Sequence, residues 1–137
     1  MAKIQKNGKI LICEDLLNER NILKGILEKA NYNIILEAES GLEALKSCEK
    51  DAPDMVLLDL EMPQMDGLET LIRIKEIDKN IRVIMLSNLS QQEQVIDALQ
   101  AGALDFIMKP FQEEHVLETI EKNRGIKGNG KGSLGTE

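Results

Sequence analysis

The chain has 137 residues, of which 42% are hydrophobic and 30% charged, and its formal net charge is −7. This length suits a single domain with a sizeable core, and no apolar run reaches the roughly 20 residues that a membrane span needs. The acidic balance, with only two phenylalanines, one tyrosine and no tryptophan, speaks against direct binding of nucleic acid, which uses basic clusters and aromatic stacking.

The two cysteines and the N-terminus bear on the compartment. Cys13 and Cys48 form neither a CxxC pair nor a metal-binding spacing, so we expect two buried thiols. Residues 1–7 have no apolar stretch after their basic residues, so they do not resemble a secretory signal. Together these features favour a reducing, cytoplasmic location.

The first half of the chain alternates short apolar runs with stretches of helical periodicity. It predicts a strand at 9–13, a helix at 18–31, a strand at 33–38, a short helix that ends before Pro53, and a strand at 55–60. These strands are largely apolar along their length, which is typical of parallel strands buried on both faces. Asn31 is the expected stop of the first helix.

The second half continues the same alternation. It predicts a helix at 68–77, a strand at 81–86, a helix at 91–101, a strand at 104–108 and a helix at 113–123. Gly102 is the expected stop of the fourth helix. Five strand–helix units in succession predict a doubly wound α/β fold: a flavodoxin-like parallel sheet of five strands in the order 2-1-3-4-5, with helices on both faces.

The composition changes near the C-terminus. Five glycines fall within residues 125–137, and the apolar periodicity ends there. We therefore expect one folded domain over residues 1–124, followed by a flexible tail or the stub of a linker at 125–137.

In such a sheet, ligands bind outside the carboxyl ends of the strands, where the winding reverses between the first and third strands. The second strand leads into Ala38-Glu39, away from that crevice. The polar residues that end or follow the other four strands are Glu14, Asp15, Asp59, Ser87 and Lys109. We expect three carboxylates, one hydroxyl and one ammonium to converge in one crevice.

This set of groups predicts a specific chemistry. Carboxylates within roughly 5 Å repel by about 3 kcal/mol per pair at an effective dielectric near 20, so protons or a cation must compensate them. Hard oxygen ligands suit Mg²⁺. A metal-bound Asp59 beside Lys109 and Ser87 has the groups of a phosphoryl-accepting aspartate, with the ammonium and the hydroxyl able to bind phosphoryl oxygens.

Five short motifs carry a family resemblance. In order they are ILICED at 10–15, DLEMP at 59–63 with DG at 66–67, MLS at 85–87, AGALDF at 101–106 and KPF at 109–111. From about Lys9 to Asn123 the chain resembles the response-regulator receiver domains of two-component signalling. Within that family, the last helix and the KPF motif are more similar to stand-alone, chemotaxis-type regulators.

The resemblance implies roles for the residues of the crevice. Asp59 would take a phosphoryl group from a phosphohistidine of a sensor histidine kinase or phosphotransfer protein. Glu14, Asp15, Asp59 and the backbone carbonyl of Glu61 would hold Mg²⁺ or Mn²⁺. Lys109 would bind the phosphoryl group. The protein would be a phosphoprotein with weak autophosphatase activity rather than an enzyme.

The resemblance also implies a switch and a partner surface. Ser87 would move toward the phosphoryl group, and Phe106 would follow as a rotating aromatic side chain. The Lys109–Pro110 bond is expected to be cis. Phosphorylation would then shift the face formed by the fourth helix, fifth strand and fifth helix toward binding a downstream protein partner, without direct contact with nucleic acid and without membrane insertion.

Several residues depart from the family pattern or have plainer interpretations. Asn88 stands where a small alanine is common, and Glu61 and Leu89 flank the route of an attacking water, so the dephosphorylation rate is open. Arg20 is interpreted as a solvated helix residue. Asp66-Gly67 is interpreted as a turn in which Gly67 supplies a positive φ.

Three alternative functions share part of this pattern. A phosphohydrolase of the haloacid dehalogenase type also uses an aspartate nucleophile, but it needs Asp-x-Asp, whereas this chain has Asp59-Leu60-Glu61. A flavin-binding module of similar fold needs a phosphate cradle rich in serine, threonine and glycine, and the loop after the first strand is acidic. The third alternative is the receiver fragment of a larger regulator such as a chemotaxis methylesterase.

Overall fold

The computed structural model describes residues 6–125, so the tail predicted at 125–137 lies almost wholly outside the described residues. Strands and helices alternate along the chain, with one short 3-10 helix before α4. In chain order the elements are β1 (Lys6–Cys13), α1 (Leu17–Lys29), β2 (Tyr32–Ala38), α2 (Gly41–Asp51), β3 (Met55–Asp59), α3 (Gly67–Ile77), β4 (Arg82–Ser87), η1 (Leu89–Gln91), α4 (Gln92–Gln100), β5 (Asp105–Met108) and α5 (Glu113–Asn123).

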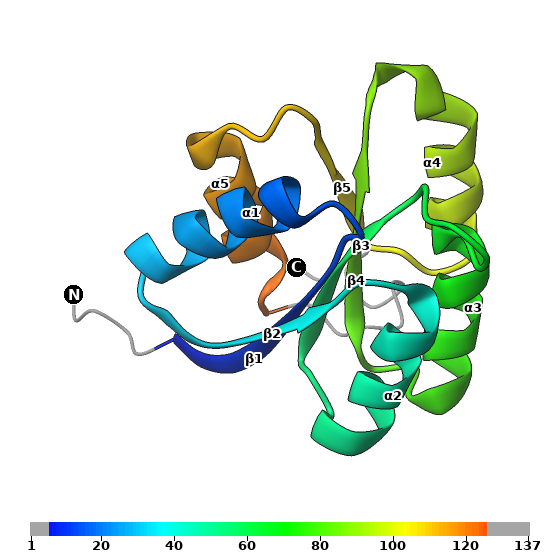
Figure 1. The fold of residues 1–137 in the computed structure, drawn as a ribbon, viewed down its shortest axis with the longest axis horizontal. Helices are drawn as coiled ribbons and strands as arrows, with labels where there is room; N and C mark the ends of the chain where they lie inside the picture. Colours follow the sequence, from blue (N-terminus) through cyan, green and yellow to red (C-terminus); the bar gives the residue numbers. More distant parts are fainter. Residues whose placement is uncertain (1–5, 126–137) are drawn as a thin grey trace.

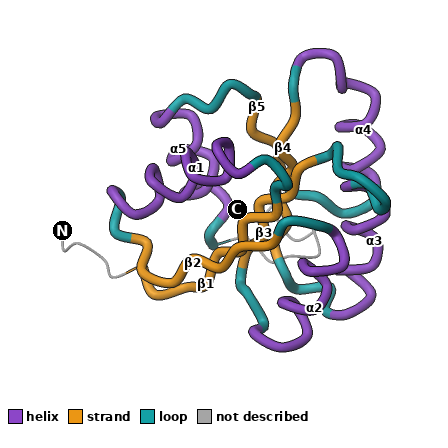
Figure 2. Tube along the Cα trace, in the orientation of Figure 1, coloured by secondary structure: helices purple, strands orange, loops and turns teal. Residues whose placement is uncertain are grey.

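All strand pairs are parallel, and the order in the sheet is β2-β1-β3-β4-β5. Helices α1 and α5 cover one face of the sheet, whereas α2, α3 and α4 cover the other (Figure 1). The helices therefore form two outer layers around a central sheet, which the tube drawing also shows (Figure 2). The predicted doubly wound α/β fold and its strand order are confirmed.

The core consists of two apolar clusters separated by the backbone of the sheet. In β3, Val56 and Leu58 pack with α2, α3 and α4, whereas Met55 and Leu57 pack with α1 and α5. The alternation follows from the two-residue period of a strand. Because every residue of β3 is buried, the charge of Asp59 is held at the end of a fully covered strand.

The loop after β3 is shaped by the start of α3. Asp66 caps this helix, since its Oδ1 accepts a hydrogen bond from the backbone N–H of Glu69 at 3.0 Å. The interpretation of Gly67 as a positive-φ turn residue is wrong: it is the first residue of α3 and is not among the residues with positive φ. A Cβ at Gly67 would overlap the backbone of Asp59 and Leu60, so glycine is required there for close packing.

The predicted stops and the buried thiols are as expected. Asn31 has φ 71° just beyond α1, and Gly102 has φ 117° just beyond α4. Cys13 and Cys48 are buried and form no disulfide. The Lys109–Pro110 peptide bond is cis. Over residues 6–125, none of the helices combines the length and the apolar character that crossing a bilayer demands.

Candidate functional site

Three carboxylates meet at the carboxyl ends of β1 and β3. One oxygen from each of Glu14, Asp15 and Asp59 lies within 4.8 Å of the others. Glu14 and Asp59 are buried and Asp15 is half-buried. We call these three residues the acidic cluster. The convergence follows from the strand order, because β1 and β3 are hydrogen-bonded neighbours in the sheet.

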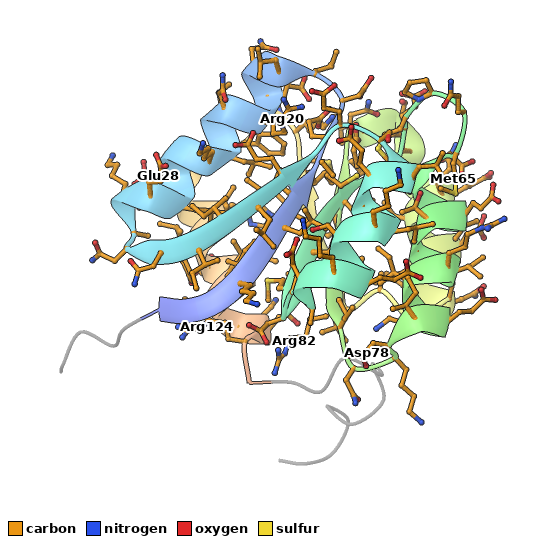
Figure 3. The ribbon with its side chains drawn as sticks, turned by 60° about the horizontal axis from the view of Figure 1, so that its bottom comes forward. Arg20, Glu28, Met65, Asp78, Arg82 and Arg124 are labelled. Carbon is orange, nitrogen blue, oxygen red and sulfur yellow. The ribbon has the colours of Figure 1, made fainter. Side chains whose placement is uncertain are left out.

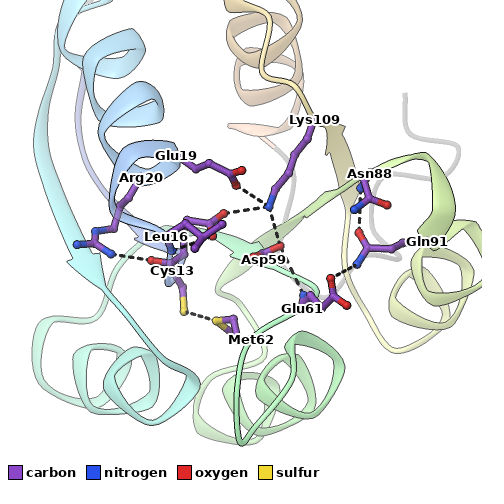
Figure 4. A network of polar contacts seen from close by, with 11 residues as sticks. Cys13, Leu16, Glu19, Arg20, Asp59, Glu61, Met62, Asn88, Gln91 and Lys109 are labelled. Atoms are coloured by element: carbon purple, nitrogen blue, oxygen red, sulfur yellow. Dashed lines mark hydrogen bonds and ion pairs between the residues drawn. The ribbon is translucent and has the colours of Figure 1, made fainter.

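Lys109, which follows β5, extends its side chain into the acidic cluster (Figure 4). Its Nζ lies 3.2 Å from Glu14 Oε1 and 3.2 Å from Asp59 Oδ1. A third carboxylate, Glu19 of α1, is closer still, with its Oε1 2.8 Å from Nζ. One partly buried ammonium is therefore shared by three carboxylates. The sequence predicted that Glu14 and Asp59 lie in the crevice with Lys109, but it did not predict Glu19.

The burial of these charges shifts their pKa values. Burial, reinforced by the charge of Asp59, raises the pKa of Glu14 to about 8. Burial also raises the pKa of Asp59, although the ammonium of Lys109 opposes the rise. For Lys109, burial lowers the pKa, but the hydrogen bond to Glu19 and the charges of Asp59 and Glu14 outweigh it, so the pKa is raised. Without a metal ion, the acidic cluster is short of positive charge.

The donor set fits a small divalent cation. Glu14 Oε2 accepts a hydrogen bond from the backbone N–H of Leu16 at 3.2 Å, which fixes the carboxylate. Its Oε1 is buried and, among residues 6–125, lacks a hydrogen-bond partner apart from the ion pair with Lys109. Carboxylate oxygens from Glu14, Asp15 and Asp59 at this spacing are the ligands that Mg²⁺ prefers.

A pocket of about 520 Å³ opens beside the acidic cluster. Its lining includes Asp15, Glu19, Asp59, Glu61, Asn88, Gln91 and Lys109. The backbone N–H of Glu61 points to Asp59 Oδ1 at 3.5 Å, so this peptide borders the carboxylate. Asp59 is only 3% exposed, and it is among the residues that line this pocket.

Gln91 joins two sides of the pocket, and the sequence reasoning missed it. Its Oε1 accepts a hydrogen bond from the backbone N–H of Asn88 at 2.8 Å, and its Nε2 donates to Glu61 Oε1 at 3.5 Å. Asn88 and Gln91 form a capping box for η1. An asparagine followed three residues later by glutamine is a recognisable helix-start signal, which could have revealed this bridge.

Ser87 ends β4 as predicted, but its hydroxyl does not contact Asp59 or Lys109 in this structure. Within residues 6–125, the buried Oγ has no hydrogen-bond partner. The backbone carbonyl of Ser87 accepts a hydrogen bond from the N–H of Lys109 at 2.7 Å. Ser87 also lines an apolar pocket of about 300 Å³ with Phe106, Ile96 and Leu99.

The interpretation of Arg20 as a solvated residue is wrong. Arg20 is only 6% exposed. Its Nη1 donates to the backbone carbonyl of Glu14 at 2.7 Å (Figure 4). Its Nε pairs with Glu37 Oε1 at 2.9 Å, and Figure 3 shows where Arg20 lies on α1. Arg20 thus ties the end of β1, which carries Glu14 and Asp15, to β2 and α1.

Known sequences match this chain over most of its length. A family model described as the response regulator receiver domain matches residues 10–121. The chain is 47% identical over 114 residues to chemotaxis protein CheY of Bacillus subtilis, covering 83% of this chain and 95% of that protein. It is 37% identical over 123 residues to sporulation initiation phosphotransferase F of the same organism, covering 90% and 98%.

Solved structures share the fold. The receiver domain of NtrX from Brucella abortus superposes with a TM-score of 0.83 at 29% identity, covering 87% of this chain and all of that one. A CheY-like response regulator receiver domain protein from Methanospirillum hungatei gives a TM-score of 0.81 at 28% identity, with coverage of 87% and 94%.

Proposed function

Because the chain belongs to the response regulator receiver domain family, we propose that it accepts a phosphoryl group on Asp59. Receivers of this kind are signalling proteins rather than classical enzymes, and they interact with histidine kinases or phosphotransfer proteins. The observation that carries the assignment is the 3.2 Å contact between Lys109 Nζ and Asp59 Oδ1 beside Glu14 and Asp15.

The proposed reaction is a phosphoryl transfer from a phosphohistidine. A carboxylate oxygen of Asp59 forms a bond to phosphorus while the bond from phosphorus to the imidazole nitrogen breaks, and the electron pair stays on that nitrogen. Lys109 binds an oxygen of the phosphoryl group in transit, since it already lies beside the accepting carboxylate. The pocket beside Asp59 admits the donor.

Glu14, Asp15, Asp59 and the backbone carbonyl of Glu61 are proposed to hold Mg²⁺ or Mn²⁺. When bound, the ion neutralises charge on the phosphoryl oxygens and on the acidic cluster. Arg20 supports this arrangement because it fixes the peptide of Glu14.

Weak autophosphatase activity is proposed for the phosphorylated form. The pocket beside Asp59 is large enough to hold water, and its lining includes Glu61 and Gln91. The side chains of these two residues contact each other at 3.5 Å. They are therefore the residues expected to set the rate of hydrolysis, together with Leu89, whose place beside the route of water is a prediction from the family pattern.

The proposed switch links Ser87 and Phe106 to a partner surface. A phosphoryl group adds about one to two negative charges and several strong acceptors, and the buried Ser87 Oγ could donate to one of them. Movement of the Ser87 side chain toward the phosphoryl group would open space beside Phe106, which is half-buried and lines the apolar pocket. The face of α4, β5 and α5, where Ile96 is 53% exposed, would then bind a downstream protein.

We propose that residues 1–124 act as a stand-alone regulator in the cytoplasm. The chain covers 95% or more of two relatives named chemotaxis protein CheY, which supports this role over that of a methylesterase fragment. The family match leaves the phosphohydrolase and the flavin module without support. The cytoplasmic location and the domain boundary stay predictions.

Labelling with a small phosphodonor tests the assignment. The protein is incubated with phosphoramidate and Mg²⁺, and the acid-stable but hydroxylamine-sensitive product is followed by a phosphate-affinity gel. Asp59→Asn should abolish the product, whereas Asp97→Asn, which removes an exposed carboxylate of α4, should leave it intact. Labelling of the Asp59→Asn variant at the normal rate would refute the role of Asp59.

A second experiment tests the switch. Beryllofluoride and Mg²⁺ are added to isotope-labelled protein, and backbone amide shifts are mapped by NMR. We expect changes at Ser87 and Phe106 and along the α4, β5 and α5 face. Changes confined to the residues around Asp59 would contradict the proposed coupling.

A further inference from the structure

Glu19 is the nearest partner of Lys109 in the acidic crevice. The distance from Lys109 Nζ to Glu19 Oε1 is 2.8 Å, compared with 3.2 Å to each of Glu14 and Asp59. Glu19 lies in the first turn of α1 and lines the pocket beside Asp59. A carboxylate with no part in the proposed metal site thus makes the shortest contact with the proposed phosphoryl-binding ammonium.

The direction of this side chain has a local cause. A glutamate in the first turn commonly reaches back to the backbone N–H of the residue that caps its helix. Here that N–H, of Leu16, already donates to Glu14 Oε2. Glu19 therefore extends away from its own helix, across the crevice, to Lys109.

The contact is also enclosed. Glu19 Oε1 is buried and has no hydrogen-bond partner apart from its ion pair with Lys109, within the part of the chain that the structure describes. The side chain of Glu19 is 30% exposed, and that of Lys109 is 17% exposed. If Lys109 moved to a phosphoryl group, Glu19 would lose its partner and remain close to a second anion.

We propose that Glu19 is a positioning residue that holds Lys109 in the unphosphorylated protein and competes with the phosphoryl group for its ammonium, so that it slows phosphorylation of Asp59. This inference rests on the function proposed above. Glu19 is a counter-anion whose contact with Lys109 must weaken as the phosphorus approaches Asp59. It also adds negative charge to the lining of the pocket that an anionic phosphodonor enters.

The test compares Glu19→Gln with wild type. Glutamine keeps the shape and a hydrogen-bond acceptor but removes the charge. The matched control is Glu28→Gln, which removes one charge from the exposed face of the same helix. Rates of phosphorylation by phosphoramidate are measured at saturating Mg²⁺ for each protein, so that altered metal affinity does not enter. We expect Glu19→Gln to react on the order of tenfold faster and Glu28→Gln to match wild type.

An equilibrium measurement separates this role from a structural one. Beryllofluoride binding, measured by NMR titration at saturating Mg²⁺, should be several-fold tighter in Glu19→Gln, because the bound anion no longer competes for Lys109. Glu19→Asp keeps the charge but is one methylene shorter, so its rate should lie between wild type and Glu19→Gln. Thermal unfolding of each variant confirms that it is folded.

The possible outcomes test the role of Glu19 separately from the proposed phosphorylation of Asp59. If wild type is labelled at Asp59 and Glu19→Gln is labelled no faster than Glu28→Gln, the role of Glu19 is refuted and the proposed function stands. A slower rate in Glu19→Gln also refutes it, since Glu19 would then be assisting Lys109. If wild type is not labelled, or if labelling persists in Asp59→Asn, the proposed function itself fails.

Discussion

The ammonium nitrogen of Lys109 lies 3.2 Å from Asp59 Oδ1, although β4 lies between β3, which ends in Asp59, and β5, which precedes Lys109. The long side chain of lysine bridges this distance across the edge of the sheet. The contact places a single cation where Asp59 and Glu14 are both buried. The balance between this cation and the surrounding carboxylates governs how the site responds to substitution, pH and metal.

Replacement of Lys109 by methionine should strengthen Mg²⁺ binding while it impairs phosphorylation. The substitution removes a positive charge from beside the acidic cluster, so a divalent cation becomes its principal compensation. We expect Mg²⁺ affinity at pH 8 to rise on the order of tenfold, measured by isothermal titration calorimetry. Lys46→Met, at an exposed position of α2, serves as the control. Weaker Mg²⁺ binding in Lys109→Met would contradict the charge balance described for the site.

The metal-free protein should lose stability as the pH rises from about 4.5 to about 8, because the pKa of Glu14 is raised from 4.5 to about 8 in the folded state. In this window the unfolded chain has lost the proton that the folded protein still holds, so rising pH favours unfolding. Urea denaturation in EDTA measures the effect. Glu14→Gln should flatten the profile, and saturating Mg²⁺ should oppose the loss. A profile that is equally steep in Glu14→Gln would exclude Glu14 as the cause.

Two glycine-to-alanine substitutions should have opposite effects. Gly67→Ala places a Cβ against the backbone of Asp59 and Leu60, and we expect a destabilisation of about 1–3 kcal/mol. Gly25→Ala lies in the middle of α1, and no atom other than those of its chain neighbours and the nearby backbone of its own helix lies within 4 Å of the new Cβ. This substitution should stabilise the protein by about 0.5–1 kcal/mol. Urea denaturation compares the two. A neutral Gly67→Ala would show that the loop after β3 adjusts easily.

Replacement of Ser87 by alanine should stabilise the unphosphorylated protein and weaken its response to beryllofluoride. The buried Oγ lacks a hydrogen-bond partner among residues 6–125, so its removal should gain about 1 kcal/mol. The same variant has no hydroxyl to donate to a bound anion, so beryllofluoride should bind less tightly. Ser90→Ala, which loses a 2.7 Å hydrogen bond to Asn88, should not be stabilised. If Ser87→Ala is destabilised, the hydroxyl has a partner in solution.

The strands and the acidic cluster could be predicted because both depend on residue type and chain order. The apolar run that ends in Asp59 marks a buried strand, and the strand order then brings Glu14 and Asp15 beside it. These inferences do not depend on the direction that a long side chain takes. A parallel sheet fixes the positions of its strand ends, and the short acidic side chains at those ends stay close to the backbone that carries them.

The residues that escaped prediction are those whose roles depend on side-chain direction. Arg20 and Glu19 are adjacent in α1, yet one turns toward β2 and the other toward Lys109. Helical spacing places both near the crevice but does not say which partner each one selects. Gly67 was misread because both a turn and a close approach favour glycine, and only the three-dimensional packing against Asp59 distinguishes them.

The division of the core by the sheet has a consequence for how this protein can change over evolutionary time. The residues that pack α1 and α5 form one cluster, and those that pack α2, α3 and α4 form another, with the sheet backbone between them. Substitutions in separate clusters that share no partners have nearly additive effects on stability. Side chains on one face of the sheet can therefore be substituted during evolution without compensating substitutions on the other face. The acidic cluster is held in place by both apolar clusters.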